Sequence, residues 1–304
     1  MKLQIHHGRV VNPEGLEVNA TLHCNMRCLH CSHLSPLYHR RNIDPGPLHD
    51  TLTVLARSYH ASYVKILGGE PLLHPDLPAV IEAVRASRVS DTVLVCTNGT
   101  LLARAPLRLW AAVDALEVSV YPSRPLGAED ISTIRSLAGD HGVDLLVNYY
   151  GHFRVAYSEQ GTESAALVQD IFDTCKLAHL WLSHTVHDGW LYRCPQSIML
   201  PEQLSHAGWD RGVDGIEIEA GPAFPARLLE FLNRATPLRA CRHCLGSVGR
   251  LHPHTEVPRA QWRQDQPTED LIDPEFLLLA KDDIAIDDGC EEPSCPVPAG
   301  TWGG

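Results

Sequence analysis

Three cysteines close together near the start of the chain constrain its fold more than any other feature. Cys24, Cys28 and Cys31 are spaced C-x3-C-x2-C within residues 22–32. Three thiolates at this spacing suit three irons of a [4Fe–4S] cluster and leave the fourth iron open. An open iron is a place to bind and reduce a ligand, so the spacing predicts a reactive centre on one short loop.

Zinc is the alternative metal for this loop. His23, His30 and His33 interleave with the three cysteines, and histidine is a common zinc ligand. Zinc sites usually pair two C-x2-C units or add histidines at wider spacing. The triplet therefore favours the iron–sulfur interpretation, and the zinc interpretation stays open.

Residues 16–150 alternate short apolar runs with helical stretches. The runs have the length and composition of buried parallel strands, and we expect strands at residues 16–21, 63–67, 92–96, 115–120 and 143–148. Between them, apolar residues recur at helical spacing, and we expect helices at residues 47–59, 76–86 and 128–138. Pro47 suits a helix start and Asp76 suits an N-cap. This alternation predicts an α/β fold with a parallel sheet and helices outside it.

Residues that could carry chemistry fall at or near the carboxyl ends of the expected strands. The cysteine loop follows the first strand, and Gly68-Gly69-Glu70-Pro71 follows the second. Asn98, Ser119 and Asn148 lie at or near the ends of the next three. Ligands of parallel α/β folds gather at this edge, so these groups are expected to meet there.

The cysteine spacing, followed by Gly68–Pro71, resembles the radical S-adenosylmethionine (radical SAM) superfamily. The resemblance implies a partial (β/α)6 barrel over residues 1–160, with a [4Fe–4S] cluster on Cys24, Cys28 and Cys31. In that family SAM chelates the open iron, and an electron cleaves it to a 5′-deoxyadenosyl radical that abstracts hydrogen from the substrate. The electron comes from an external donor of the flavodoxin or ferredoxin type.

The resemblance also assigns candidate SAM contacts. The backbone of the Gly-Gly-Glu-Pro segment is implied to bind the SAM amino group, which places Gly68, Gly69, Glu70 and Pro71 at the cofactor. Three polar residues could contact the SAM ribose or carboxylate, or could be plain capping and turn residues: Asn98, Ser119 and Asn148.

A second cysteine pattern lies further along the chain. Cys175-x13-Gly189-x4-Cys194 is followed by Cys241-x2-Cys244, and it resembles the opening of the SPASM and twitch auxiliary-cluster domains. Residues 245–289 contain no cysteine, so the shorter twitch form, with one auxiliary [4Fe–4S] cluster over residues 161–255, fits better. Four thiolates saturate a cluster, which leaves it electron transfer or structural closure as roles. A structural zinc site on the same four thiolates is the alternative.

Secondary structure is expected to change after residue 160. We expect a helix at 163–172, a hairpin formed by residues 181–187 and 190–193, and a helix at 225–234. Residues 200–224 and 253–275 are expected to be irregular, and residues 276–280 to form a short helix or strand.

Three cysteines remain outside both patterns. Cys96 lies near a strand end and is interpreted as a buried small hydrophobe. Cys290 and Cys295 lie among acidic residues that disfavour the thiolate, which suits a catalytic hydrogen-atom donor to a substrate radical. Cluster ligands or exposed thiols are the alternatives for this pair.

Charge is distributed unevenly. The net charge is −12, and residues 265–292 carry eleven carboxylates and one lysine. An acidic balance argues against general nucleic-acid binding. The acidic extension over residues 256–304 is compatible with a cationic small-molecule substrate or with a plain solvated tail.

Targeting features are not found. The sequence contains no apolar run long enough to span a bilayer, and the N-terminus lacks the apolar region of a signal peptide. We therefore expect no membrane partner and a cytoplasmic location, where ten cysteines point to metal or redox chemistry rather than disulfides.

The two cysteine patterns together are similar to radical SAM epimerases and dehydrogenases of aminoglycoside pathways. The resemblance implies hydrogen abstraction from a carbinol carbon of a sugar, aminocyclitol or aminoglycoside, and the spare thiols favour epimerisation. Dehydrogenation, with the auxiliary cluster as electron acceptor, is the first alternative. A peptide maturase that forms a crosslink or an epimerised residue and a non-enzymatic zinc protein are the others.

Overall fold

One open sheet organises the molecule. The computed structural model describes residues 2–204 and 211–290. Within these residues, nine strands share this sheet: β1 (Gln4–His6), β2 (Arg9–Thr21), β3 (Tyr59–Gly68), β4 (Val93–Thr97), β5 (Ala115–Val120), β6 (Asp144–Tyr149), β8 (His184–His187), β9 (Trp190–Tyr192) and β10 (Gly215–Glu217). A separate antiparallel pair is formed by β7 (His152–Arg154) and β11 (Leu251–Pro253).

The sheet is mostly parallel. Its strand order is β10-β9-β8-β2-β3-β4-β5-β6, with β1 paired to β2. All pairs from β8 through β6 are parallel, whereas β9, β10 and β1 pair antiparallel. The two ends of the path do not pair with each other, so the sheet curves without closing. The predicted α/β fold with a partial barrel is confirmed.

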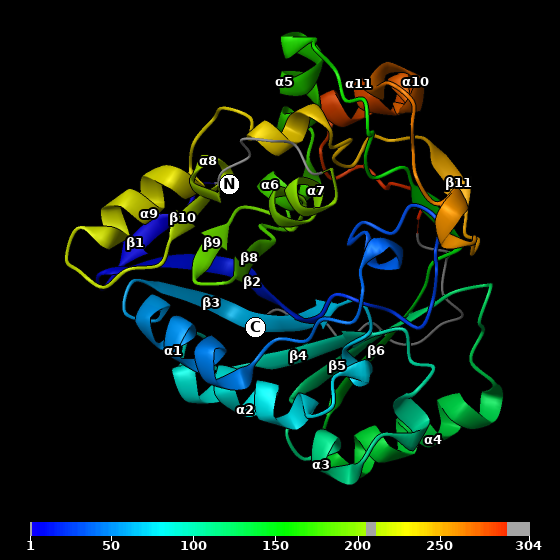
Figure 1. Ribbon diagram of the computed structural model, residues 1–304. Helices are drawn as coiled ribbons and strands as arrows, with labels where there is room; N and C mark the ends of the chain where they lie inside the picture. The colour runs from blue at the N-terminus through cyan, green and yellow to red at the C-terminus, as the bar shows by residue number, and fades with distance from the viewer. Residues whose placement is uncertain (1, 205–210, 291–304) are drawn as a thin grey trace.

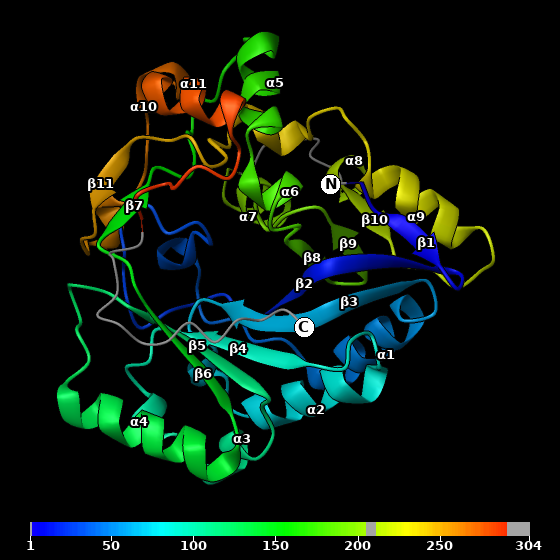
Figure 2. The same ribbon diagram turned by 180° about the vertical axis from the view of Figure 1, so that it is seen from behind.

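Helices cover the sheet from two sides. Figures 1 and 2 show α1–α4 along the outer face of β2–β6, and α5, α10 and α11 on the opposite side. The helices are α1 (Pro45–Leu55), α2 (Leu77–Ser87), α3 (Leu107–Trp110), α4 (Ala128–His141), α5 (Ala165–Asp173), α6 (Lys176–His179), α7 (Gln196–Leu204), α8 (Arg211–Asp214), α9 (Phe224–Leu232), α10 (Thr268–Leu271) and α11 (Pro274–Asp282). None of the helices in the described ranges is long and apolar enough to cross a membrane.

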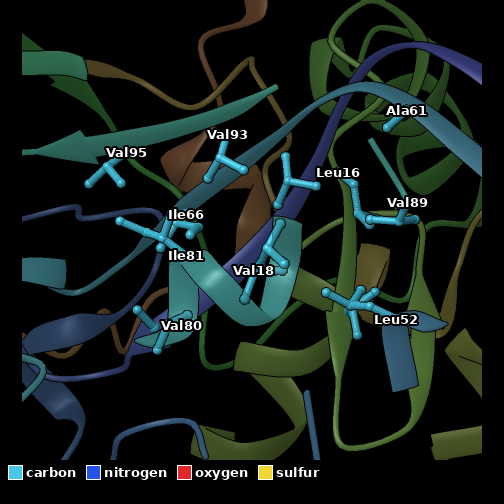
Figure 3. Close-up of a cluster of buried hydrophobic side chains, with 14 of the residues drawn as sticks. Leu16, Val18, Leu52, Ala61, Ile66, Val80, Ile81, Val89, Val93 and Val95 are labelled. Carbon is cyan, nitrogen blue, oxygen red and sulfur yellow. The ribbon is translucent and has the colours of Figure 1, made fainter. Parts of the chain in front are cut away.

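The main core lies between the sheet and its outer helices. Leu16 and Val18 on β2 point to this side, where they are fully buried beside Val80 and Ile81 of α2 (Figure 3). Because successive side chains of a strand point to opposite faces, Glu17 faces the other side. Alternation along β2 thus separates an apolar outer face from a polar inner face, and the inner face positions the site.

Most predicted elements are confirmed within a few residues, but three expectations were wrong. The helix expected at 47–59 ends at Leu55, because Tyr59 begins β3, where it pairs with Val10 of an extended β2. The stretch expected to be irregular at 200–224 contains β10, a three-residue strand that pairs with β9. The stretch expected to be irregular at 253–275 contains the short helix α10.

The predicted hairpin forms, and the strand that it pairs with shows which sheet it belongs to. Strands β8 and β9 pair antiparallel, and β8 also pairs parallel with β2 through Leu16–His184 and Val18–Val186. The hairpin therefore belongs to the same sheet as the strands before residue 160. This pairing places Cys194, which follows β9, on the framework that carries the first cysteine loop.

Candidate active site

A cavity of about 530 Å³ lies at the carboxyl ends of the parallel strands. Most residues that the sequence singled out for the first cluster and SAM line this one space: Cys24, Cys28, Cys31, Gly68, Gly69, Asn98, Ser119 and Asn148. They come from five strand ends that are far apart in the sequence. A volume of this size is typical of small-molecule sites.

Gly68 and Gly69 allow the loop after β3 to pack against the cysteine loop after β2. The Gly69 N–H donates to the Thr21 carbonyl at 2.7 Å, and the Glu70 N–H donates to the His23 carbonyl at 3.0 Å. A Cβ atom on Gly69 would lie 1.9 Å from the His23 carbonyl oxygen. Gly68 has a φ of +128° and equally little room. The glycines are therefore required for the close approach of this segment to the cysteine loop.

Glu70 and Pro71 differ from their neighbours because neither lines the cavity. Glu70 is fully buried, and its carboxylate accepts the Thr97 hydroxyl at 2.6 Å, the Asn98 N–H at 2.8 Å and the Leu72 N–H at 3.0 Å. Burial raises the pKa of Glu70, and these three donors oppose the rise. Its side chain positions the loop that carries Asn98.

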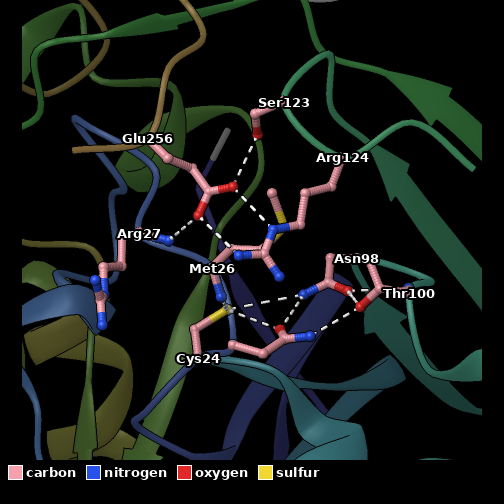
Figure 4. Close-up of polar contacts among 9 residues, drawn as sticks. Cys24, Met26, Arg27, Asn98, Thr100, Ser123, Arg124 and Glu256 are labelled. Carbon is pink, nitrogen blue, oxygen red and sulfur yellow. Dashed lines mark hydrogen bonds and ion pairs between the residues drawn. The ribbon is translucent and has the colours of Figure 1, made fainter. Parts of the chain in front are cut away.

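Asn98 connects the third strand end to the first cysteine (Figure 4). Its amide nitrogen donates to Asn25 Oδ1 at 2.8 Å and lies 3.8 Å from Cys24 Sγ. Its amide oxygen accepts the Thr100 N–H and hydroxyl, at 3.1 and 2.6 Å. Asn98 thus both caps a turn and lines the cavity, so the two alternatives for this residue do not exclude one another.

The three thiols occupy a desolvated position. Burial raises the pKa of Cys24 to about 12, and burial and the neighbouring thiols raise the pKa of Cys28. Burial also raises the pKa of Cys31. Metal coordination deprotonates a thiol outright, so bound iron would supply the positive charge that three adjacent thiolates need.

Residues 256–262 form a clamp, a set of hydrogen bonds that holds the cysteine loop in place. Local sequence patterns do not reveal these contacts. The Trp262 indole N–H donates to the Cys28 carbonyl at 2.8 Å. Glu256 accepts the Arg27 N–H at 2.9 Å and Arg124 Nε at 3.0 Å (Figure 4). Burial alone would raise the pKa of Glu256, but these donors hold it below its ordinary value. The clamp joins three distant segments around the first cysteines.

The sequence-based predictions also did not include the charged residues that line the cavity. Glu17 and Lys65 stand opposite one another on β2 and β3, yet Lys65 Nζ reaches Glu117 on β5 at 2.7 Å. Glu17 instead accepts the Thr185 hydroxyl at 3.3 Å. Burial raises the pKa of Glu17 to about 7. The available signal was a charged residue within three of the expected strands, Glu17, Lys65 and Glu117, because a buried strand rarely carries one without a use.

The three cysteines outside both patterns, Cys96, Cys290 and Cys295, do not lie together at one site among the described residues. Cys96 lines the cavity, with Sγ 3.9 Å from the Ser119 hydroxyl, so it is more than a hydrophobe within the core. Cys290 lies outside the cavity lining, where its carbonyl accepts the His152 N–H at 3.4 Å. Cys295 lies outside the described residues.

The second group of cysteines gathers at a different place. Cys175, Cys194, Cys241 and Cys244 line one small cavity of about 20 Å³, between β9, α6 and residues 239–244. Burial and the neighbouring thiols raise the pKa values of Cys241 and Cys244 far above normal. The side chain of Arg193 borders the same cavity. Four thiol donors are the ligand type of both iron–sulfur clusters and zinc.

Single-ion geometry is not found for either group. Across residues 2–204 and 211–290, no three His, Cys, Asp or Glu side chains are arranged closely enough to hold one metal ion.

Comparison with known protein families identifies the class of domain that residues 18–122 form. Residues 18–122 match the family described as the Radical SAM superfamily. This range begins within β2 and ends after β5, and it contains the first cysteines, the two glycines, Asn98 and Ser119. The chain therefore contains a radical SAM domain.

Individual relatives cover only parts of the chain. It is 32% identical over 97 residues to the GTP 3′,8-cyclase of Chlorobaculum tepidum, and 30% identical over 136 residues to a probable GTP 3′,8-cyclase of Methanococcus maripaludis. These alignments include 32% and 43% of this chain, and the chain spans 28% and 43% of the two relatives.

Solved structures give similar partial matches. The structure of BtrN in complex with AdoMet and 2-DOIA shows 17% identity and a TM-score of 0.42, over 65% of this chain and 83% of BtrN. The structure of anSMEcpe with bound AdoMet shows 18% identity and a TM-score of 0.34, over 44% of this chain and 43% of that one.

Proposed function

We propose that the protein is a radical SAM enzyme that acts on a carbinol carbon of an amine-bearing sugar, aminocyclitol or aminoglycoside. The observation that carries the proposal is the convergence of the three cysteines, the two glycines, Asn98, Ser119 and Asn148 on one cavity. A radical generated there would form within the space that holds the substrate.

The residues of this cavity fit the group that the family requires. Cys24, Cys28 and Cys31 would hold a [4Fe–4S] cluster, and the backbone at Gly68 and Gly69 would meet SAM. When bound, these groups supply a 5′-deoxyadenosyl radical that removes a hydrogen atom. The chain's own task is to orient the substrate beside that radical and to keep water away.

The charge inside the cavity supports an amine-bearing substrate. Three carboxylates, Glu14, Glu17 and Glu117, line it with a single lysine, Lys65, which is paired to Glu117. Glu17 lines the cavity with only hydroxyl support, so a substrate ammonium group would complete its interactions. The same charges disfavour a nucleoside triphosphate, the substrate named for the GTP 3′,8-cyclases.

Epimerisation is the favoured outcome, and it needs a hydrogen-atom donor. A thiol S–H that gives its hydrogen to the opposite face of the carbon radical inverts that centre and leaves a thiyl radical. One electron and one proton, from an iron–sulfur or flavin donor, restore the thiol. Cys290 and Cys295 are the predicted donors, and Cys96 is a third because it lines the cavity.

Dehydrogenation is the alternative outcome. Loss of one electron and one proton from the same substrate radical gives a ketone, and an auxiliary cluster on Cys175, Cys194, Cys241 and Cys244 would accept the electron. Four cysteines around one small cavity support this second cluster.

The test is product analysis in deuterium oxide. Reconstituted protein, SAM and reductant are incubated with an aminoglycoside such as neamine and with its amine-free counterparts. An epimer with solvent deuterium at one carbon supports epimerisation, and loss of this product in only one of Cys96→Ala, Cys290→Ala and Cys295→Ala identifies the donor. A ketone without deuterium supports dehydrogenation. Failure to form 5′-deoxyadenosine with any substrate contradicts the proposal.

A further inference from the structure

Arg193 is a buried cation with no anionic partner. It is 3% exposed, and none of the ion pairs in the described ranges includes it. A terminal nitrogen of the guanidinium donates to the Arg234 carbonyl at 2.7 Å, and the group lies 5.2 Å above the Phe172 ring. Burying an unpaired charge is costly, and arginine cannot shed its charge by deprotonation.

Arg193 also borders the four-cysteine cavity. The Nε atom of Arg193 is buried and has no hydrogen-bond partner, while the residue lines the cavity together with Cys175, Cys194 and Cys241. An N–H donor and a full positive charge are therefore held beside four sulfur atoms.

We infer that Arg193 donates its Nε–H to the sulfur of a group bound by Cys175, Cys194, Cys241 and Cys244 and raises the reduction potential of that group. The inference rests on the auxiliary cluster of the proposed function. A cluster held by four thiolates is anionic, so it is the partner that the guanidinium lacks. Hydrogen bonds to the sulfurs and nearby positive charge favour the state that carries the extra electron.

The assignment has a chemical consequence for the substrate. Oxidation of a carbinol radical to a ketone releases one electron and one proton, and a cluster of raised potential accepts that electron more readily. Arg193 is thus a positioning residue, and its effect on the substrate concerns the dehydrogenation alternative, in which the cluster accepts the electron.

A potentiometric titration of the full-length reconstituted protein, followed by electron paramagnetic resonance, tests the inference. The auxiliary signal is the one that survives in the Cys24/Cys28/Cys31→Ala variant. Arg193→Gln should shift its reduction equilibrium at least tenfold toward the oxidised state, which is about 59 mV for one electron. Arg193→Lys keeps the charge but loses the Nε–H and should shift the equilibrium by a smaller amount, about threefold.

Arg242→Gln is the matched control. Arg242 adjoins Cys241 in the sequence, but its guanidinium is half-exposed and pairs with Glu163, so its loss should leave the potential unchanged. An unchanged potential in Arg193→Gln overturns the inference. If Arg193→Gln cannot hold the cluster, Arg193→Lys decides, because a potential equal to that of the unaltered protein also overturns it. Absence of any iron that depends on Cys241 and Cys244 would instead contradict the auxiliary cluster itself.

Discussion

The two cysteine groups differ in their surroundings more than in their ligands. The first group lines a cavity of about 530 Å³ that also contains glutamates, a lysine and tyrosines. The second group lines a much smaller cavity, of about 20 Å³, whose lining is almost wholly apolar. A bound substrate fits the first space and cannot enter the second.

Under the proposed function, this difference separates substrate chemistry at the first cavity from electron transfer at the second. Three cysteines at the larger cavity leave a coordination position on a cluster for a ligand, whereas four at the smaller, apolar cavity leave none. Charge follows the same division: the larger cavity has excess carboxylates, and the smaller one has the buried cation Arg193. Each of the following predictions tests one side of this comparison.

Removal of the first cysteine group should have the largest effect. We expect Cys24/Cys28/Cys31→Ala to abolish 5′-deoxyadenosine formation and to lower the iron content from about eight to about four per chain. Iron analysis and chromatography of SAM products measure both effects. Cys290→Ala is the control and should keep all the iron. Residual SAM cleavage in the triple variant would show that the larger cavity is not the SAM site.

Removal of the second cysteine group should separate the two functions. We expect Cys241→Ala/Cys244→Ala to lose about four irons as well, but to bind SAM as the unaltered protein does, because neither cysteine lines the cavity proposed for SAM. Equilibrium binding of SAM and iron analysis provide the measurement. Zinc in place of iron at this site would exclude the electron-transfer role.

Gly69→Ala should disturb the larger cavity without touching a ligand. The new Cβ would meet the His23 carbonyl at 1.9 Å, and overpacking of this kind costs about 2–3 kcal/mol of unfolding free energy. Gly139→Ala on α4 is the matched control, since nothing lies within 4 Å of its Cβ, and it should gain about 0.5–1 kcal/mol. Chemical denaturation measures both, and equal effects would contradict the packing argument.

Glu17→Gln should change the free energy of unfolding by an amount that depends on pH. Burial raises the pKa of Glu17 to about 7, while Lys65 and hydrogen bonds from Ser183 and Thr185 oppose the rise; Glu117 adds to it. Because the folded-state pKa exceeds the unfolded value, ionisation destabilises the fold as pH rises from about 4.5 to above 7. We expect Glu17→Gln to stabilise the protein by about 3 kcal/mol at pH 8 and by almost nothing below pH 4.5. Thermal unfolding at both pH values checks this, and a gain that does not depend on pH would contradict it.

Much of the site was predictable because its signals are local. The strand runs, the cysteine spacing and the Gly-Gly pair each occupy a few consecutive residues, and parallel strands bring their carboxyl ends to one edge. This reasoning predicted that Cys24, Gly69, Asn98 and Ser119 lie together, and all four line one cavity. It did not place Glu70, whose side chain points into the protein to hold three donors.

Other features depend on contacts between distant segments. No local pattern shows that β8 joins β2, that Trp262 holds the Cys28 carbonyl, or that Lys65 reaches past its neighbour to Glu117. The same limit applies to Cys96, whose place in the cavity follows from which face of β4 turns inward.

The sequence by itself determined the α/β class and the sheet edge at which the candidate site residues lie, because spacing and periodicity act over a few residues. Only the tertiary structure decided the sizes of the two cavities, and that Glu17 lines the larger one and Arg193 the smaller. These properties arise when long-range packing removes water from some side chains and leaves it with others, and free energies of that kind depend on all the surrounding segments at once.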